Sequence, residues 1–456
     1  MPFHRFDRQR IVREVTATLK LALPLILAQL AAMGSSVVDT ILSGHVGPQV
    51  LGAVAVGTGV WSLAVVTGIG VMLAVPSTVS QLEGAGQRRS IADVLIQSQW
   101  LGLIVGVILM LLMRHAIWLV DVMGVDPGLR QGVAGFLRAI SWGAPALTCY
   151  FGMRGMSEGM GLTRPSMWFS FGGLLLLAPL DYALMYGRFG IPPQGAEGCG
   201  AATALVLWLQ TLSFACYIRW RADYRDLGWD RVRRWPSWVI LGPLLHIGVP
   251  MAISLLAESG MFVAAALLIG RLGASAVSAH QVALNISALF FMVPLGLSMA
   301  ITVRVGQAVG RGDPVDRAYA GFCGIGLTLL TQALSASLLL LAPRMLAQVY
   351  TSDPQVVNNT VMLLALAGLF QFSDGIQVAS GGALRGMKDT RVPMLVTIFA
   401  YWLVGLPVGW WLAFPGRLGA RGMWMGLVAG LSVAAILLLG RFWRRNRPAM
   451  AVAGLI

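Results

Sequence analysis

Four acidic residues lie inside long apolar runs of this sequence: Asp39, Asp181, Glu258 and Asp374. A charged side chain at the centre of a bilayer costs about 2.5–3.5 kcal/mol on insertion scales, so such residues are few and face the protein interior. No Lys or Arg lies within one helical turn of any of the four, so they do not form local ion pairs. Carboxyl groups in this setting are suited to binding a proton or a bare monovalent cation.

Neutral polar residues in the same apolar runs could assist such a site. Gln29, Gln281 and Asn285 offer amide oxygens, although residues of this kind more often form hydrogen bonds between helices. His246 and His280 stand alone in the sequence, and we expect them to serve packing or hydrogen bonding.

We expect neither an enzyme nor a cofactor site nor a nucleotide-driven pump. The sequence has no HExxH segment, no intramembrane pair of histidines and no GxxxxGK[ST] segment. The four cysteines lack the spacing of metal ligands, so we expect small buried apolar residues rather than disulfides or a metal site. These are Cys149, Cys199, Cys216 and Cys323.

The composition predicts an integral membrane protein that places these acids in its interior. Hydrophobic residues make up 57% of the 456 residues and charged residues only 11%, whereas soluble proteins carry roughly a quarter charged residues. The mean hydropathy is +0.75. The net charge of +14 comes from short clusters between apolar runs, which is typical of membrane loops and argues against nucleic-acid binding.

Twelve apolar stretches approach or exceed the roughly 20 residues that a helix needs to cross a bilayer. The first is too long for a cleavable signal peptide, so we expect it to be retained. We predict spans at residues 17–43, 51–80, 93–119, 131–153, 162–186, 197–219, 241–270, 277–308, 316–342, 357–383, 392–414 and 419–441.

The distribution of Lys and Arg predicts that both termini are cytoplasmic. The N-terminal segment, the even-numbered connections and the C-terminal tail are rich in these residues, and the odd-numbered connections are poorer. The longest polar stretch, residues 221–240, is predicted to link an N-terminal lobe at 1–220 to a C-terminal lobe at 241–456. Its mixture of Trp and Arg suits a position at the lipid headgroups, although a plain solvated loop fits equally well.

The two predicted lobes are related by an internal repeat. A shift of 226 residues aligns Pro24 with Pro250 and continues through the first two spans without a gap. A shift of 227 aligns the segment at 159–167 with that at 386–394, in the connection between the fourth and fifth spans of each half. We therefore expect an all-α fold of twelve helices in two six-helix lobes of the same orientation, as in transporters with parallel repeats. A duplicated scaffold without a transport role is the alternative.

The residues around the acids resemble those of the multidrug and toxic compound extrusion (MATE) family, and the likeness extends over essentially the whole chain. The NorM-like branch is closest, because it carries acids at the positions of Glu258 and Asp374. The resemblance rests on Pro24…Gln29…Gly34…Val38-Asp39-Thr40, Glu258-Ser259, Ala279-His280-Gln281-Val282-Ala283-Leu284-Asn285, Gly386-Met387-Lys388-Asp389-Thr390 and Gly195-x-x-Gly198-Cys199-Gly200-Ala201-Ala202-Thr203.

This resemblance implies a monomeric antiporter in the inner membrane of a bacterium. It would export varied, often cationic and aromatic, drugs and dyes through a central cavity, in exchange for H⁺ or Na⁺, and would confer antibiotic resistance. Asp39 would be the acid of the N-terminal lobe, and Glu258 and Asp374 would form the proton or Na⁺ site of the C-terminal lobe. We expect a role in the cavity for Phe290 and Met292, next to Phe291 on the eighth span.

The fifth span departs from the NorM-like pattern, which usually has asparagines near Leu177 and Asp181. An aspartate at the second position is similar to the DinF-like branch, in which it pairs with the acid of the first helix for proton coupling. The identity of the coupling ion is therefore open, with a preference for protons. A flippase for lipid-linked precursors is the main alternative, but it would need a cationic cavity. A membrane enzyme acting on lipid is not supported by an HExxH segment or an intramembrane pair of histidines.

Overall fold

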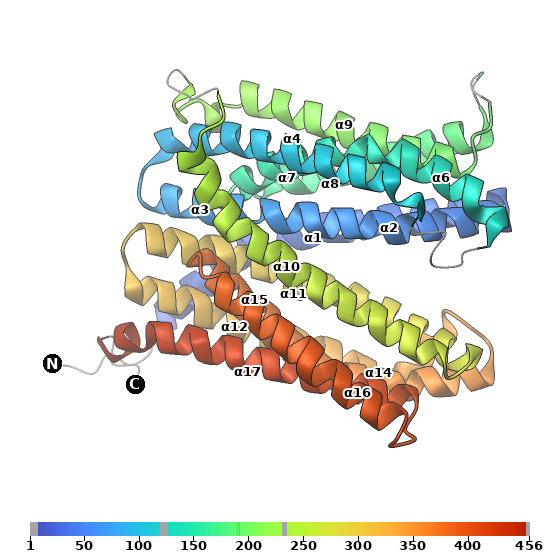
Figure 1. Ribbon diagram of the computed structural model, residues 1–456. Coiled ribbons are helices and arrows are strands. Elements are labelled where there is room, and N and C mark those ends of the chain that lie inside the picture. Colours follow the sequence, from blue (N-terminus) through green and yellow to red (C-terminus); the bar gives the residue numbers. More distant parts are fainter. Residues whose placement is uncertain (1–7, 119–125, 189, 191, 230–234, 453–456) are drawn as a thin grey trace. The chain divides into compact units, whose positions relative to one another are not determined.

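The protein is described by a computed structural model, which covers residues 8–118, 126–188, 190, 192–229 and 235–452 (Figure 1). The described residues form helices joined by short connections, and eleven of these helices are long and apolar enough to cross a membrane. They are α1 (Arg8–Val46), α2 with α3 (Pro48–Met72, Ala74–Gly84), α4 (Ile91–His115), α8 (Arg164–Tyr186), α9 (Ala196–Trp220), α10 (Trp238–Gly270), α11 (Ala274–Gly310), α12 (Pro314–Leu341), α14 (Pro354–Gly386), α15 with α16 (Arg391–Ile398, Leu406–Ala413) and α17 (Ala420–Val452).

The remaining predicted span, 131–153, is divided between two shorter helices. These are α6 (Pro127–Ser141) and α7 (Gly143–Gly159), separated by Trp142 alone. Pro145 has no N–H to bond the carbonyl of Ser141, so the helical ladder is interrupted at that point. The break between α2 and α3 has the same cause, because Pro76 follows Met72 by four residues. Counted with α6 and α7 as one bent element, the predicted twelve-helix layout agrees with the structure.

The eleventh span contains a turn of π-helix. It covers Phe399–Gly405, between α15 and α16, where the sequence predicts a continuous span at 392–414. Pro407 cannot bond the carbonyl of Leu403, and this favours the wider turn. Gly405 lies against the backbone of α17, where a Cβ on Gly405 would come within 3.2 Å of the Gly430 Cα.

The chain forms two compact units, one with residues 27–252 and the other with the beginning of α1 up to Ile26 and the residues from Ile253 onward. The boundaries therefore fall inside α1 and α10. In the second unit, Arg304 pairs with Glu14 at 2.7 Å, and Asp316 pairs with Arg10, so two ion pairs hold the beginning of α1. The predicted lobes, 1–220 and 241–456, are defined by the repeat and stay a prediction, since these units are defined by packing.

Equivalent contacts occur at equivalent positions of the repeat. In the unit of residues 27–252, a Cβ on Gly70 would meet the Ala252 backbone nitrogen at 2.8 Å. In the other unit, a Cβ on Gly296 would meet the Ile26 backbone nitrogen, also at 2.8 Å. The shift of 226 residues relates Gly70 to Gly296 and Ile26 to Ala252. Each glycine thus permits the same close approach of two helices, so the repeat is one of packing as well as of sequence.

Part of the predicted linker folds back onto the unit of residues 27–252. A short 3-10 helix, η2 (Ala222–Tyr224), places the hydroxyl of Tyr224 at 2.8 Å from that of Ser157. Tyr224 and Leu227 are buried in the core of this unit. Residues 230–234 of the linker lie outside the described residues.

Candidate functional site

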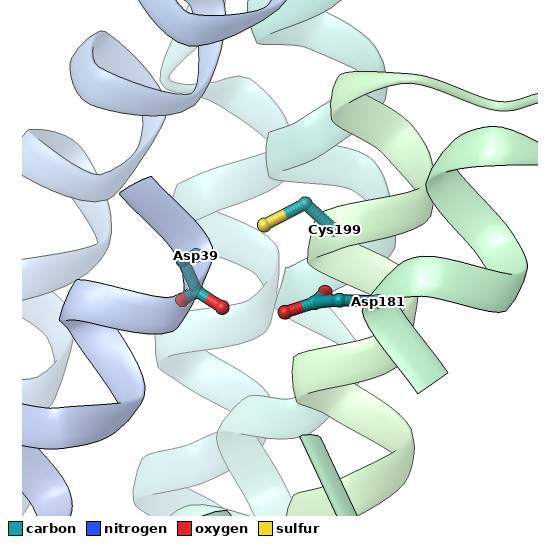
Figure 2. Close-up of side chains that lie close together, drawn as sticks. All are labelled: Asp39, Asp181 and Cys199. Carbon is teal, nitrogen blue, oxygen red and sulfur yellow. The ribbon is translucent and has the colours of Figure 1, made fainter. Parts of the chain in front are cut away.

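The first acidic region lies in the unit of residues 27–252 and joins Asp39 of α1, Asp181 of α8 and Cys199 of α9. We call these three residues the acid–thiol cluster. One oxygen of each carboxylate and the Cys199 Sγ all lie within 4.8 Å of one another, and Figure 2 shows the side chains turned toward a common point. Asp181 and Cys199 are fully buried, whereas Asp39 is partly exposed. The structure thus brings together two acids that are separated by 142 residues in the sequence.

The end of α8 and the start of α9 position Asp181 and Cys199. The backbone N–H of Gln194 donates to the Leu184 carbonyl at 3.1 Å, and that of Gly195 donates to the Met185 carbonyl at 3.2 Å. Gly195 has a φ of 54°, a left-handed conformation that glycine adopts without strain. The chain therefore turns sharply and begins α9 beside α8, with Cys199 in its first turns.

Contacts between α1 and α8 position Asp39. The hydroxyl of Tyr186 donates to the Leu42 carbonyl at 3.0 Å on one side of the cluster. On the other side, a Cβ on Gly34 would approach the Leu174 side chain to 3.2 Å, so a larger residue would push α1 from α8. These contacts hold the Asp39 carboxylate opposite Asp181.

The acid–thiol cluster contains acids without a neutralising cation. Among the described residues, no basic side chain is paired with either aspartate. Outside the cluster itself, both oxygens of Asp181 and one oxygen of Asp39 are buried without a hydrogen-bond partner in the described structure. Two unit charges 4.8 Å apart repel by about 3.5 kcal/mol at an effective dielectric constant of 20. The pair is therefore suited to a state in which a proton or a cation lies between the carboxylates.

The wall next to the cluster is apolar. Leu177, one helical turn before Asp181, is buried and packs with Ala202 and Val206 of α9. The nearest non-carboxylate group of the cluster is a thiol, which is a soft ligand, whereas hard cations such as Na⁺ prefer oxygen. The chemistry of these groups fits a proton better than a sodium ion.

The second acidic region is a cavity of about 310 Å³ in the other unit, which we call the acid-lined cavity. Glu258 of α10 and Asp374 of α14 both line it, and the two carboxyl groups interact electrostatically. The remaining lining residues are mostly aromatic or polar: Phe262, Gln281, Leu284, Asn285, Ser287, Ala288, Phe291, Phe370 and Trp424. This region differs from the acid–thiol cluster in having space for a ligand.

A half-buried arginine compensates part of the negative charge of the acid-lined cavity. Arg385 interacts electrostatically with Glu258 and donates a hydrogen bond to the Ser298 hydroxyl. No Lys or Arg lies within one helical turn of the acids in the sequence. Arg385 lies three turns after Asp374 on α14, so the local sequence does not reveal it as a partner. Packing between helices supplies the charge that the local sequence does not.

Trp424 is held in the wall of this cavity by His280. The indole N–H donates to the His280 Nδ1 at 3.1 Å, so this nitrogen is unprotonated and the proton of a neutral imidazole resides on Nε2. The rings of Phe370 and Trp424 lie 6.2 Å apart between centroids. Aromatic faces next to two carboxylates form a surface suited to a flat organic cation.

The other predicted site residues have different surroundings. Gln281 and Asn285 line the acid-lined cavity, whereas Phe290 packs against the hydrophobic core. Met292 is partly buried and, in the described structure, is absent from the residues that line this cavity; Phe291 lines it instead.

Gln29 lies in the other unit and takes part in a buried charge network. Its side-chain oxygen accepts a hydrogen bond from the Arg154 guanidinium at 3.1 Å, and Arg154 also pairs with Glu158 at 2.6 Å. Gln29 is therefore engaged in binding an arginine of its own unit.

Sequence reasoning missed Cys199, Arg385 and Trp424. Cys199 was expected to be a small buried apolar residue, and it is buried, but its sulfur faces two carboxylates. The glycine-rich entry into α9 that contains Cys199 was the available signal, since it permits close packing at Gly198. Arg385 and Trp424 had no signal in the sequence beyond their residue types.

Comparison with protein families places this geometry in a known context. A family model described as MatE matches residues 24–183 and 250–411, one stretch in each half of the chain. The chain is 45% identical to the probable multidrug resistance protein NorM of Xanthomonas campestris, over 97% of both chains. It is 41% identical to the multidrug resistance protein PmpM of Pseudomonas aeruginosa, over 96% of this chain and 93% of that one.

Solved structures share the same fold. The eukaryotic MATE transporter AtDTX14 superposes with a TM-score of 0.86 at 21% identity, over 97% of this chain and 100% of that chain. An outward-facing multidrug resistance MATE transporter of the MOP superfamily also gives a TM-score of 0.86, at 22% identity and over 98% of both chains. At this level of identity, the structures establish the likeness of fold alone.

Proposed function

Because the chain belongs to the MatE family, in its NorM-like branch, we propose that it is a multidrug exporter that exchanges drugs and dyes for protons. The relatives that match over nearly the whole chain are named for multidrug resistance. The chain is a multi-pass membrane protein, with eleven described helices long and apolar enough to cross a membrane. We further propose that it acts as a monomer without an organic cofactor and catalyses no covalent reaction.

The observation that carries proton coupling is the acid–thiol cluster. It holds two facing carboxylates, a thiol and an apolar wall, with no paired cation among the described residues. A proton needs only two carboxylate oxygens, whereas Na⁺ needs a shell of oxygen ligands. These features favour H⁺ over Na⁺ as the ion that binds at Asp39 and Asp181.

The acid-lined cavity supports a preference for cationic aromatic substrates. Glu258 and Asp374 provide negative charge, and Phe291, Phe370 and Trp424 provide aromatic surface. A cation over an aromatic face gains about 0.5–2 kcal/mol, more where water is excluded. Glu258 and Asp374 could hold Na⁺ as well, but the aromatic faces beside them add attraction for a flat organic cation, and Arg385 offsets part of the negative charge for either ligand.

The transport cycle follows from ion binding that differs between two states. A proton taken up between Asp39 and Asp181 from the periplasm removes their repulsion and lets α1 and α8 pack more closely. The change in packing releases the drug outward, and loss of the proton to the cytoplasm restores the drug-binding state. The ion can shift this equilibrium only by as much as its affinity differs between the two states.

The distribution of basic residues supports an orientation with both termini in the cytoplasm of a bacterium and the protein in the inner membrane. Export then runs from cytoplasm to periplasm. A flippase for lipid-linked precursors is disfavoured, because its substrate is anionic and the acid-lined cavity carries two acids.

Efflux from everted membrane vesicles tests this proposal. A dye such as ethidium would be loaded while a pH gradient and a sodium gradient are imposed separately. We expect the pH gradient alone to drive transport, and vesicles without the protein are the control. Transport driven only by the sodium gradient would refute proton coupling, and transport driven by neither gradient would refute the antiporter.

A further inference from the structure

A groove on the unit of residues 27–252 lies apart from both acidic regions. It encloses about 540 Å³, within the range of small-molecule sites. Its walls are α4, with Gln99 and Leu103, and α9, with Trp208 and Arg219, and its floor is Cys149 and Met153 of α7. Neither the acid–thiol cluster nor the acid-lined cavity shares a residue with it.

The groove is bordered by exposed apolar side chains of membrane-spanning helices. Leu103 and Leu212 on its rims are 41% and 57% exposed. Farther along the same helix faces, Ile104 and Ile108 of α4 and Leu209 of α9 are exposed as well. In a membrane protein such a surface contacts lipid, so an acyl chain can enter this groove directly from the bilayer.

The length of the groove corresponds to one leaflet. From Trp208 to Arg219 along α9 is eleven residues, or about 16 Å at the helical rise of 1.5 Å per residue. One leaflet of the hydrocarbon core is about 15 Å thick, half of the roughly 30 Å total. Arg219 is next to the last residue of α9, so it lies at the headgroup end of the groove, and Trp208 lies near the middle of the bilayer.

The charge at the headgroup end favours an anionic ligand. Arg219 is exposed and forms no ion pair in the described structure. The neighbouring acids already have partners, since Asp223 pairs with Arg221 at 3.4 Å and Asp226 pairs with Arg88 at 2.9 Å. In the part of the chain that the structure describes, one positive charge therefore remains without a counterion at the level where phosphate groups lie.

The indole of Trp229 closes this end of the groove. Its N–H donates to the Tyr224 carbonyl at 2.6 Å, and this bond fixes the ring beside α9. Tryptophan rings are typical of the headgroup level of membranes. A fixed aromatic ring beside an unpaired arginine matches the junction between a lipid phosphate and its acyl chain.

From these observations we propose that the groove between α4 and α9 binds one anionic phospholipid, with its phosphate at Arg219 and an acyl chain over Cys149 and Met153. The groove takes this lipid in preference to a zwitterionic one because Arg219 has no counterion among the described residues. A cationic drug is disfavoured by the same charge. The proposal depends neither on the identity of the coupling ion nor on which side of the membrane the Arg219 end of the groove lies.

Lipid retention by the purified full-length protein tests this proposal. The protein would be incubated with mixed micelles of equal amounts of dioleoylphosphatidylglycerol and dioleoylphosphatidylcholine, then separated from free lipid, and the bound lipids counted by mass spectrometry. Wild type should retain about one phosphatidylglycerol in preference to phosphatidylcholine. Arg219→Ala should lower this preference about fivefold, the effect of one basic residue at an anionic surface.

Two further variants separate the groove from general surface charge. Ala215→Trp fills the groove and should abolish retention of both lipids, while the double variant Arg221→Ala with Asp223→Ala, which removes a neighbouring ion pair as a whole, should leave retention unchanged. The melting temperature should rise with phosphatidylglycerol in wild type but not in Ala215→Trp.

Four results would overturn the proposal. The first is wild-type retention in both Arg219→Ala and Ala215→Trp, and the second is an equal loss in the double variant Arg221→Ala with Asp223→Ala. The third is displacement of the bound lipid by a cationic dye, and the fourth is a dimer in wild type that Ala215→Trp disrupts, because either would assign the groove to another occupant.

Discussion

The two acidic regions differ in what surrounds their carboxylates. In the acid–thiol cluster, Asp39 and Asp181 face each other with a thiol and an apolar wall, and no basic residue of the described structure is paired with them. In the acid-lined cavity, Glu258 and Asp374 border about 310 Å³ of space, and Arg385 offsets part of their charge. The first region has room for a proton, and the second has room for a molecule.

This difference arose on a duplicated scaffold. The repeat aligns Asp39 with Ala265 and Glu258 with Ala32, so these two acids each correspond to an alanine in the other half of the sequence. The contact of Gly70 with Ala252 and that of Gly296 with Ile26 are nevertheless the same contact in the two units. Packing has been kept where helices approach closely, and chemistry has changed farther along the same helices, six residues after Ala252 at Glu258 and 13 residues after Ile26 at Asp39.

The largest effect is expected from neutralising the acid–thiol cluster. Asp39→Asn and Asp181→Asn each remove a carboxylate from the pair, and a pair with one acid no longer needs a shared proton. We expect efflux driven by a pH gradient to fall at least tenfold in proteoliposomes, with normal amounts of protein in the membrane.

Glu197→Gln provides the matched control for these variants. Glu197 is an exposed acid in the first turn of α9, two residues before Cys199. It should keep wild-type efflux. Equal losses in all three variants would show a general effect of charge at this end of α9.

A substrate-selective effect is expected from the acid-lined cavity. Glu258→Gln removes one of two negative charges beside the aromatic wall, so binding of a cationic dye should weaken about tenfold while binding of a neutral dye changes less than twofold. Dye fluorescence polarisation with the purified protein gives both affinities. Glu258→Asp keeps the charge and should retain most of the selectivity. Equal weakening for both dyes would contradict a charge-based role.

A smaller effect is expected in a loop where one half has a glycine and the other half has a lysine. Gly161 and Lys388 occupy equivalent positions, and both have positive φ, 82° and 56°. Lysine is strained in this conformation, and burial also lowers the pKa of Lys388 because it disfavours the charged amine. Lys388→Gly should therefore raise the free energy of unfolding by about 1 kcal/mol, whereas Gly161→Lys should lower it by a similar amount or more.

Thermal inactivation of the detergent-solubilised protein checks this pair of variants. A lower melting temperature for Lys388→Gly would show that the lysine side chain makes contacts worth more than the strain. The equivalent positions Gly161 and Lys388 would then differ in what stabilises the loop.

The smallest effect is expected at the thiol. Cys199→Ser replaces sulfur by an oxygen of similar shape, which leaves the two carboxylates in place but adds a harder ligand. Proton-driven efflux should change less than about twofold, and a weak inhibition by high sodium should appear in the same assay. A complete loss of efflux would mean that the thiol itself carries the proton.

The sequence was sufficient for most of the fold because the membrane constrains it strongly. Apolar length identified the spans, and glycines with prolines identified the repeat. The breaks at Trp142 and Leu73 could have been placed only in part: each lies three residues before a proline, but other prolines lie inside unbroken helices, such as Pro24, Pro179 and Pro294. The turn of π-helix at Phe399–Gly405 could not, because Pro407 permits a kink or a wider turn and only packing on α17 decides between them.

The candidate sites were predictable only in part. An acid in an apolar run is visible in a sequence, and all four acids lie in the two regions described above. Their partners depend on which faces of distant helices meet. Cys199 and Arg385 belong to these regions through such contacts, and Phe290 and Met292 show that neighbours of a lining residue on a helix point elsewhere.

Proton release on drug binding tests the central claim most directly. Purified protein in weakly buffered detergent would be mixed with a saturating cationic drug while a pH indicator is followed. Wild type should release close to one proton per drug bound, and Asp181→Asn should release almost none although Glu258 and Asp374 are intact. Equal proton release by wild type and Asp181→Asn, or none by wild type, would contradict a proton held between Asp39 and Asp181.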